Sequence, residues 1–498
     1  MNILLFWQCG MDSPAIKRLF HKMDVKFCAY FYENKNDQLP ESDVARIPIY
    51  SEEKLEFFCQ NESDMLPLDA KILEGMQPYS MTAFDIINRW RKSITTNHSY
   101  FNLREIYMIY LRYWNNFLLA NKIDFVYFQF MPHIPNTYFI YAICKIHNIP
   151  IVIENFMPLV GTHRENHYLN VSLEKMNFNF EERLNENKKL YTLNDDDIPL
   201  CPELERYFEN YSQEAKKVQN VIYFNEKNTL AESISKYWNR GKIYISKRKY
   251  KILLKKVLYL LTIKQKNKKI QRYAASKSTD TDFNVPFFFF PLHMQPECTT
   301  LPCGGVFVDQ LEVVRMVASS LPDGFFLYVK EHPAYWTRKG HWESMGEARS
   351  RKYYDTITSL KNVKLIKHSY SSLEIMDKCS AVVAITGTAG FEALFKNKPV
   401  LVFANHFYHS FPGVLRIKNN EDCVNAVKQV INGEVQFSMR DLRIALKTME
   451  PYIFPMAPNM KSFIDSGGEP VSEEELIYLV DSVACFAKNN YGIQVKEE

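Results

Sequence analysis

Three apolar runs in the carboxyl-terminal half of the chain each end in polar residues, and this pattern constrains the fold most. Each run is short and rich in β-formers, which predicts a buried strand. Histidine, lysine, threonine or glutamate side chains follow each run at once. Open parallel α/β sheets bind ligands at the carboxyl ends of their strands, so the three loops are expected to form one site. The runs cover 285–290, 325–330 and 381–385.

Strand-like and helix-like segments alternate regularly from 284 to 455, and the same alternation opens the chain. Strands are expected over Met1–Gln8 and Val25–Phe31, with a helix between them. Such alternation predicts parallel sheets with helices on both faces. The predicted fold class is therefore α/β, with two doubly wound Rossmann-like domains that face a central cleft, the architecture known as GT-B.

Changes in composition divide the chain into four segments. We expect a first Rossmann-like domain in 1–230, in which the polar, acidic stretch 170–228 forms an insertion with helices over that domain. A basic helical linker follows in 231–283, and the second Rossmann-like domain covers 284–455. The last segment, 456–498, is expected to form a helix that packs back on the first domain. A chain of 498 residues is long enough for two or three hydrophobic cores.

The linker has a strong positive charge. Fourteen lysines and arginines fall within 236–272 around the apolar run 252–261, and no acidic residue occurs between Glu232 and Asp280. A basic amphipathic helix of this kind either lies on an anionic membrane surface or forms a solvated interdomain helix pair, and both interpretations stay open. Nucleic acid is disfavoured as a partner because no recognised binding motif accompanies the charge.

Composition excludes several other classes of protein. Hydrophobic residues at 46% and charged residues at 24% are ordinary for a globular chain. The formal net charge of +4 is small for this length, so a preference for anions must come from local clustering. Ten scattered cysteines, without a CxxC pair or zinc spacing, fit a reduced, cytosolic compartment. We expect neither a signal peptide nor a transmembrane helix, because no apolar stretch is long enough.

Two loops of the second domain have groups suited to an anion. His332 and Pro333 directly follow a predicted strand, with Lys330 two residues earlier, and both cationic side chains can donate hydrogen bonds to a phosphate. A histidine that only satisfies a loop carbonyl is the alternative. The loop 386–390 supplies two hydroxyls and backbone N–H groups at a predicted helix start, which suits an anion or a tight turn with an N-cap threonine. Glu392, expected in the first turn of that helix, suits a ribose or merely the helix amino end.

A carboxylate lies in the loop after the first strand of the second domain. Glu297 follows Gln295 and precedes Thr299 and Thr300, and it suits the role of nucleophile, base or electrostatic stabiliser at a sugar carbon. Asp309 is the competing carboxylate, although it is placed where it would cap a helix. No Asp-x-Asp or other paired-carboxylate motif lies near these strands, which disfavours a metal-dependent transferase.

The first domain contributes two further candidates. His133 and Glu154 are expected just past the ends of strands over 124–130 and 149–153, where they would face the cleft. The alternative for His133, which lies among prolines, is a loop residue that only hydrogen-bonds its surroundings.

The three loop blocks in this order resemble the bacterial capsule polysaccharide synthesis family, which includes retaining β-Kdo transferases. The resemblance rests on 291–300, 328–333 and 386–400, spans 284–455, and extends faintly to Pro132-His133. Its His-Pro element is similar to that of bacterial sialyltransferases that use CMP-sugars.

The resemblance implies a GT-B glycosyltransferase with an acceptor domain first and a nucleotide-sugar-binding domain second. It would move a 2-keto-3-deoxy sugar acid, either Kdo or a nonulosonic acid of sialic, pseudaminic or legionaminic type, from its CMP conjugate to a glycan or glycolipid acceptor of a bacterial surface glycan. Transfer with retention and without metal or cofactor is implied, in the bacterial cytoplasm or at the inner face of the cytoplasmic membrane. Two alternatives are a CDP-alcohol-dependent polyol-phosphate transferase of teichoic-acid type and a non-catalytic scaffold of capsule assembly.

The resemblance also implies roles for individual residues. His332, with Lys330 and Pro333, would contact the CMP phosphate, and Glu392 would contact the ribose. Glu297 would be the nucleophile. The remaining candidates are Thr386, Gly387 and Thr388 for the phosphate or sugar carboxylate, Gln295, Thr299 and Thr300 for the substrate, and His133 and Glu154 for catalysis.

Overall fold

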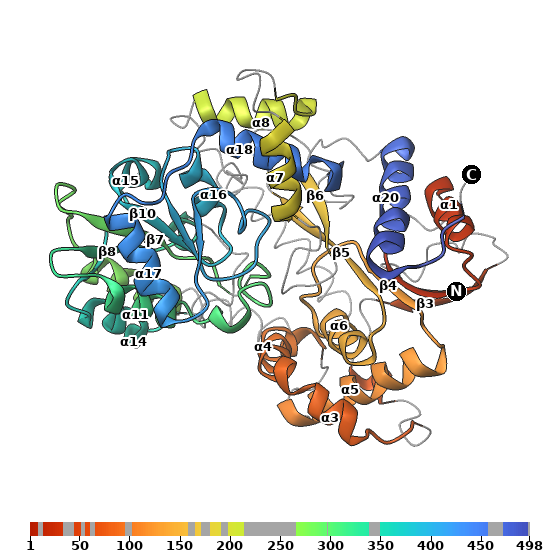
Figure 1. Cartoon of the computed structure of the whole chain (residues 1–498). Coiled ribbons are helices and arrows are strands. Elements are labelled where there is room, and N and C mark those ends of the chain that lie inside the picture. The colour runs from red at the N-terminus through yellow and green to blue at the C-terminus, as the bar shows by residue number, and fades with distance from the viewer. Residues whose placement is uncertain are drawn as a thin grey trace, which may run out of the picture.

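The chain forms two lobes, each built on one sheet with helices on both faces (Figure 1). We call the lobe around the seven-stranded sheet the first lobe and the lobe around the six-stranded sheet the second lobe. This arrangement confirms the predicted fold class, two doubly wound Rossmann-like domains of the GT-B architecture. A cleft between them stays a prediction. The computed structural model describes residues 1–7, 13–32, 44–50, 55–59, 65–94, 102–157, 165–170, 180–190, 198–213, 265–295, 297–337, 349–456 and 472–496.

The first sheet has the strand order β13-β6-β5-β4-β1-β2-β3, and the second has β12-β11-β10-β7-β8-β9. The strands of the first lobe are β1 (Asn2–Phe6), β2 (Phe27–Tyr32), β3 (Ala45–Tyr50), β4 (Phe125–Phe128), β5 (Ile151–Met157), β6 (Glu165–Asn170) and β13 (Ile453–Met456). Those of the second lobe are β7 (Phe287–Pro291), β8 (Phe326–Lys330), β9 (Val363–Leu365), β10 (Ala381–Ala384), β11 (Val400–Val402) and β12 (Val414–Arg416). The sequence did not predict β3, β6, β12 and β13, because β6 (ENHYLN) lacks an apolar run and β12 is only three residues long.

Numbered within its own lobe, the second sheet has the strand order 6-5-4-1-2-3 of dinucleotide-binding folds. The first sheet has the same order, with β13 added beside β6 as a seventh strand. All neighbouring strands of the second sheet are parallel. The order reverses between β7 and β10, and ligands of open α/β sheets bind outside the carboxyl ends of such a pair. In the first sheet the corresponding pair is β1 and β4, and two antiparallel strands, β6 and β13, extend its edge.

The helices begin at recognisable signals. Ser13 caps α1 (Pro14–Lys22) by accepting the Ile16 N–H at 3.3 Å. Asp309 caps α11 (Gln310–Ser320) by accepting the Leu311 N–H at 3.0 Å. The sequence predicted this capping role, which made Asp309 a weaker candidate than Glu297. The other first-lobe helices are α2 (Leu55–Phe58), α3 (Ala70–Gly75), α4 (Gln77–Ile94), α5 (Leu103–Ala120), α6 (Pro135–His147) and α20 (Glu473–Tyr491).

The helices of the second lobe surround its sheet. Successive residues of β7 alternate between the two faces, since Phe287 and Phe289 belong to one buried cluster and Phe288 and Phe290 to another. The helices, with two 3-10 turns, are η2 (Gly305–Phe307), α11, α12 (Ala334–Thr337), α14 (Arg351–Ser359), α15 (Ser372–Lys378), α16 (Thr388–Leu394), α17 (Asn420–Ile431), α18 (Met439–Met449) and η3 (Glu450–Tyr452).

Helices α7 (Phe180–Leu190) and α8 (Pro202–Gln213) correct the predicted placement of the acidic insertion. The sequence placed helices from 170–228 over the first domain, but these two helices bury Phe180, Leu184, Tyr207 and Tyr211 in the core of the second lobe. Each helix has a polar average composition but an apolar stripe along one face. The prediction used the average composition of the segment and therefore missed the apolar face. Figure 1 shows both helices beside α18.

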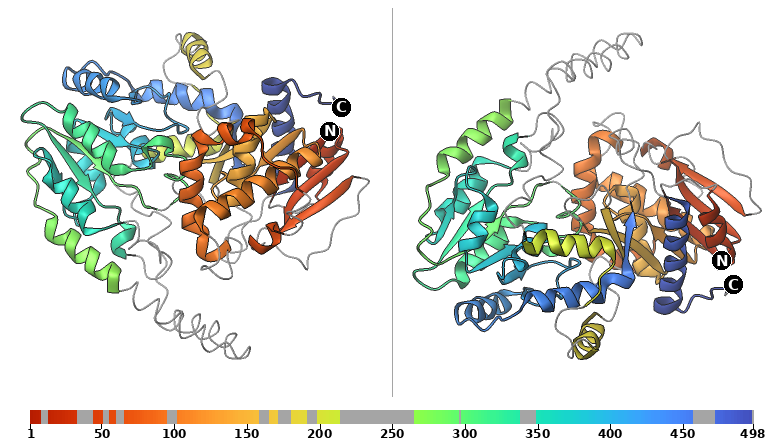
Figure 2. Two further views of the ribbon diagram at one scale, coloured as in Figure 1. Left: turned by 90° about the horizontal axis from the view of Figure 1, so that it is seen from below. Right: turned by 90° about the horizontal axis from the view of Figure 1, so that it is seen from above.

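The end of the chain returns to the first lobe. Strand β13 pairs with β6, so the predicted domain border at 455 falls inside a strand of the first sheet. Helix α20 then packs on α1, where Arg18 binds Asp481 through two nitrogens at 2.7 and 2.8 Å. Both termini therefore lie on the same lobe, as Figure 2 shows from two sides.

Most of the basic segment 236–272 lies outside the described residues. Its described part belongs to a helix over 265–277, whose Lys266, Lys268, Lys269 and Arg272 are exposed. The membrane-surface interpretation stays a prediction. Within the described ranges, no helix has both the length and the apolar character needed to cross a bilayer.

Candidate active site

Polar side chains gather at the carboxyl edge of the second sheet, around the point where the strand order reverses. His293 follows β7, Lys330 ends β8 and His332 follows it, Gly387 follows β10, and His406 follows β11. His293 interacts electrostatically with both His332 and His406, so each of these two imidazoles lies near His293. The structure thus brings the predicted His-Pro loop and the predicted 386–390 loop to one site.

His293 occupies the centre of this edge and was not among the sequence candidates. Its ring Nε2 accepts the backbone N–H of Ile385 at 3.0 Å. The ring lies against Gly387, where a Cβ atom would stand 2.5 Å from the His293 Cε1. Residue 387 is therefore glycine because the imidazole takes the space of a side chain. Burial lowers the pKa of His293 to about 3, so the ring is neutral.

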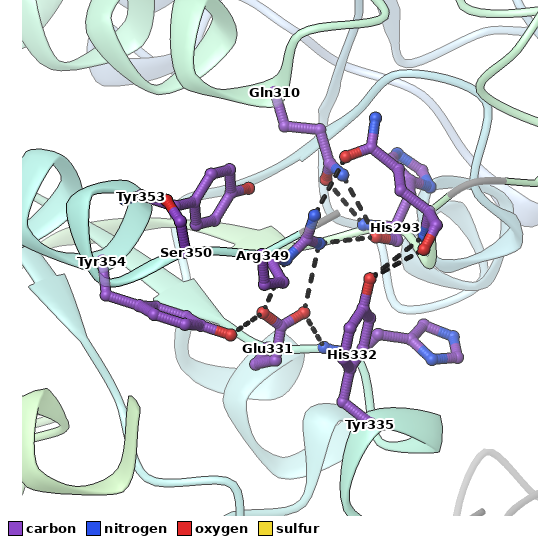
Figure 3. A network of polar contacts seen from close by, with 10 residues as sticks. His293, Gln310, Glu331, His332, Tyr335, Arg349, Ser350, Tyr353 and Tyr354 are labelled. Carbon is purple, nitrogen blue, oxygen red and sulfur yellow. Dashed lines mark hydrogen bonds and ion pairs between the residues drawn. The ribbon is translucent and has the colours of Figure 1, made fainter. Parts of the chain in front are cut away.

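A buried ion pair fixes the loops that bear these histidines (Figure 3). The Arg349 Nε donates to Glu331 Oε2 at 2.9 Å, and both side chains are almost fully buried. The same guanidinium donates to the His293 carbonyl at 3.0 Å and to Gln295 Oε1 at 2.9 Å. Glu331 also accepts the His332 N–H at 2.8 Å. Burial alone would lower the pKa of Arg349, but Glu331 outweighs it and holds that pKa above its usual range.

Aromatic side chains enclose the ion pair. Tyr335 and Tyr353 stack on the guanidinium of Arg349, with its Cζ 4.9 and 4.5 Å from their ring centroids. The Tyr354 hydroxyl donates to Glu331 at 2.7 Å. Tyr335 also donates to the Gln295 carbonyl at 2.9 Å, so α12 holds the loop after β7. These contacts lock the two loops together.

Lys330 places a cation inside the same edge. Its side chain is buried, and its Nζ donates to the hydroxyl of Ser372 at 2.8 Å. Burial lowers the pKa of Lys330 to about 8, because a hydroxyl does not compensate the charge. An anionic ligand group would do so, which keeps Lys330 among the candidates for a phosphate contact.

The structure shows how Thr386, Thr388 and Glu392 are engaged. The Thr386 hydroxyl donates to the Thr299 carbonyl, and its side chain is buried, so it holds the Glu297 loop. Glu392 is in the second turn of α16, not in the first as predicted, and bonds Thr388. Burial raises the pKa of Glu392, which lies among the tyrosines of α8 and Tyr408. The predicted contact to a ribose stays a prediction.

The loop that contains Glu297 is held mainly by its own residues. The Thr299 hydroxyl donates to Glu297 Oε2 at 3.1 Å. Thr300 is fully buried and donates to the Glu297 carbonyl at 3.2 Å, which assigns it to the loop's structure. Gln295 uses both ends of its amide internally, accepting from Arg349 and donating to the Val308 carbonyl at 2.7 Å. Among the three predicted substrate contacts, Thr300 is buried and Gln295 bonds the buried Arg349. Thr299 is partly exposed, and its hydroxyl bonds the partly exposed Glu297.

Arg89 of α4 joins the two lobes beside this loop. It donates to the carbonyl of His133 in the first lobe and, at 3.2 Å, to the carbonyl of Leu301 in the second. Burial lowers the pKa of Arg89, while the nearby charge of Glu297 raises it. The predicted catalytic residues His133 and Glu297 therefore both lie near one guanidinium. Sequence reasoning missed Arg89, because nothing local distinguishes it from other helical arginines.

The two first-lobe candidates differ in placement. His133 is partly buried in the loop after β4, and its Nδ1 donates to the Met131 carbonyl at 2.7 Å. Burial lowers its pKa, which favours the neutral imidazole. Glu154 lies within β5 and is buried, which corrects the prediction that it follows the strand and faces a cleft. The strand continues because 154–157 pair with β6, a strand that the sequence did not predict.

Of the other histidines, His406 and His409 belong to the loop after β11. Burial lowers the pKa of His406 to about 3 and that of His409 to about 4. Tyr408 between them donates to the Gly387 carbonyl at 2.6 Å and holds the start of α16. Among the described residues, no group of three or more His, Cys, Asp or Glu side chains is placed to hold a metal ion. Transfer without metal stays a prediction.

Solved structures give likenesses of low TM-score. The match titled "Thermosulfurimonas dismutans KpsC, beta Kdo 2,7 transferase" has 17% identity and a TM-score of 0.24, and covers 45% of this chain and 62% of that chain. A UDP-GlcNAc 2-epimerase from Methanocaldococcus jannaschii has 12% identity and a TM-score of 0.26, and covers 90% and 97%. This chain thus spans about three fifths of the KpsC chain. At these TM-scores the likenesses carry no argument, and no curated protein matches.

The family model gives a more specific result. Residues 196–436 match the model described as capsule polysaccharide biosynthesis protein. The matched range includes α8, which packs on the second lobe, and every strand of the second sheet. It therefore contains the whole carboxyl edge described above. The likeness to the capsule polysaccharide biosynthesis protein family therefore covers residues 196–436 of this chain.

Proposed function

We propose that this protein is a glycosyltransferase of capsule synthesis that binds a nucleotide sugar at the carboxyl edge of the second sheet. One observation carries the proposal, the gathering of His293, His332, His406 and Lys330 where the strand order reverses. A buried lysine and several imidazoles suit an anionic ligand, and a nucleotide sugar brings a phosphate to them. The match of the same residues to the capsule polysaccharide biosynthesis family supports a role in capsule synthesis.

The donor proposed is a CMP-activated 2-keto-3-deoxy sugar acid, either Kdo or a nonulosonic acid. Such a donor has two anionic groups, the phosphate and the sugar carboxylate, and the site offers separate donors to each. His332 and Lys330 would bind the phosphate, and the N–H groups and hydroxyl around Gly387 and Thr388 would bind the second anion. The charge of Lys330 and the hydrogen bonds of the other donors would stabilise the leaving CMP, which is the basis for proposing transfer without metal.

Glu297 is the proposed nucleophile. Its carboxylate would attack the anomeric carbon while the bond to the CMP phosphate breaks and CMP leaves with the electron pair. The acceptor hydroxyl would then displace Glu297 from the sugar and lose its proton to a base, for which His133 is the candidate. Two displacements retain the configuration of the anomeric carbon. The closeness of Glu297 and His133 to Arg89 supports this assignment.

Donor turnover by the purified protein tests the proposal. We expect release of CMP from CMP-Kdo or a CMP-nonulosonic acid, faster with a glycan acceptor, and no turnover of UDP-hexoses. Glu297→Gln should abolish release and keep CMP binding, whereas the matched Asp309→Asn should keep activity. Turnover of UDP-hexoses alone would contradict the donor. Phosphorus in the product linkage would indicate transfer of a polyol phosphate instead.

A further inference from the structure

The backbone of His293 is held on both sides by buried side chains. Gln310 accepts the His293 N–H at 2.8 Å and donates to the His293 carbonyl at 3.1 Å (Figure 3). Arg349 donates to the same carbonyl at 3.0 Å. Gln310 is fully buried, and Arg349 is neutralised by Glu331. The position of this residue is therefore set before any ligand arrives.

The ring of His293 is also held in place, and its bond with the Ile385 N–H determines which ring nitrogen carries the proton. The Ile385 N–H can only donate, so Nε2 must be the unprotonated nitrogen. In a neutral ring the proton then lies on Nδ1. Gly387 leaves space for the ring, and the Nδ1 is 3.0 Å from the place where a Cβ would be. The N–H at Nδ1 therefore lies at the beginning of α16.

The Nδ1–H is not used within the described protein. The Nε2 of the ring accepts from Ile385, whereas Nδ1 donates to none of the described residues. The Nδ1 atom is also not completely enclosed by the protein. We propose that His293 binds an anionic oxygen of the donor through this N–H, as a fixed neutral hydrogen-bond donor. This inference rests on the proposed function, because it takes the ligand group to be the phosphate of a CMP-sugar.

The neutral state of His293 makes its contribution independent of pH. A second proton would have to lie on Nε2, directly opposite the Ile385 N–H. The charged or titratable groups that face the ring also oppose a positive charge, since His332, His406 and Arg349 all lie near it. The contact thus stays a single N–H donor across the pH range in which the enzyme is stable.

Two substitutions separate the ligand contact from the structural one. In His293→Asn the amide nitrogen takes the place of Nδ1 and can still donate to a ligand, but nothing reaches the Ile385 N–H. In His293→Gln the amide oxygen reaches the place of Nε2 and can still accept from Ile385, but no donor remains at the Nδ1 position. Isothermal titration with CMP, together with the Tm of each variant, measures both effects. Ser319→Ala on α11 is the control for substitution in the same lobe, because its hydroxyl bonds only the Met316 carbonyl.

For His293→Gln we expect a wild-type Tm and a CMP affinity lower by about ten- to a hundredfold, the usual range for a lost bond to a charged group. For His293→Asn we expect a Tm lower by about 2 °C or more, because a buried N–H loses its partner, and an affinity near wild type. The loss in His293→Gln should be equal at pH 6 and pH 9.

Three results would overturn the inference alone: full CMP affinity in His293→Gln, an equal loss in His293→Asn, or a loss that disappears at high pH. Failure of the proposed function is seen separately, in the wild-type protein. A wild type that binds neither CMP nor CMP-sugar would remove the donor site itself, whatever the variants do.

Discussion

At the scale of single residues, Lys330 is a buried cation whose charge a bound anion would compensate. Its ammonium is buried beside a hydroxyl, and its pKa is lowered to about 8. Arg349 is buried as deeply but has Glu331 as its counter-ion. Lys330 is therefore available to bind an anion, although its burial lowers the stability of the protein. Arg349 instead holds the loops in place through its ion pair with Glu331.

Lys330→Met is expected to stabilise the ligand-free protein and weaken nucleotide binding. The unfolded lysine keeps its proton up to about pH 10.5, and the folded one only up to about pH 8. Wild-type stability therefore rises with pH between these values, since the unfolded chain binds more protons there. The variant should be more stable at pH 7 by about 1–3 kcal/mol, and this advantage should shrink toward pH 10.

Urea unfolding at several pH values checks the stability of Lys330→Met, and titration with CMP checks binding, where we expect a loss of about tenfold or more. A variant that is less stable at every pH would show that the ammonium is compensated in the ligand-free state.

His332→Ala should raise the Michaelis constant for the donor about ten- to a hundredfold, because a hydrogen bond to a phosphate oxygen is lost. The fold should persist, since the contact of His332 with Glu331 is through its backbone N–H. Initial rates against donor concentration measure the change. His21→Ala, an exposed histidine of α1, is the matched control. An unchanged Michaelis constant would remove the phosphate contact from His332.

At the scale of elements, one ion pair ties together loops that start from different strands. Arg349 precedes α14 and contacts the loop after β7, while Glu331 belongs to the loop after β8. The relative position of His293 and His332 therefore depends on groups that do not touch the ligand. A shift of this pair would move both histidines.

Arg349→Met should cost about 3–5 kcal/mol in the free energy of unfolding, because it leaves the Glu331 carboxylate buried without its counter-ion. The double variant Arg349→Met/Glu331→Gln should recover part of this loss. Chemical denaturation provides both values. Arg315→Met is the control, since its pair with Glu312 is exposed and is expected to contribute no more than about 1 kcal/mol. A single variant as stable as this control would contradict the role of the pair.

At the scale of the whole molecule, the chain crosses between the lobes more than once. Helices α7 and α8 cover the second lobe before its sheet begins, and β13 and α20 complete the first lobe after the second has ended. Arg89 adds a direct bond from α4 to the Glu297 loop. Movement of one lobe against the other would therefore move Glu297 relative to the nucleotide site.

Arg89→Met is expected to lower kcat about a hundredfold and leave CMP affinity unchanged, because Arg89 contacts the Glu297 and His133 loops and none of the nucleotide candidates. Steady-state kinetics with the CMP-sugar and CMP titration separate the two quantities. Arg104→Met, on the exposed side of α5, is the control. An equal fall in CMP affinity would assign Arg89 to nucleotide binding instead.

The positions of the site loops could be predicted from the sequence, but the roles of the individual side chains could not. His332, Lys330 and Gly387 reach the predicted edge because each follows or ends a strand with a clear apolar run. Gln295, Thr300 and Thr386 reach it too, yet their side chains are used to hold the loops. His293 lies in the block 291–300 but received no predicted role, and only its bond to Ile385 and its contact with Gly387 distinguish it.

The sequence by itself determined the parallel strands at the centre of both α/β sheets and the polar loops at one edge, because apolar runs and helical periodicity act over a few neighbouring residues. Tertiary structure alone decided that α7 and α8 cover the second lobe and that Arg89 and Arg349 join the site. It also decided which hydroxyls and amides remain open to a ligand. The physical reason is that burial and hydrogen bonding pair groups far apart in the chain, and no local pattern records those pairs.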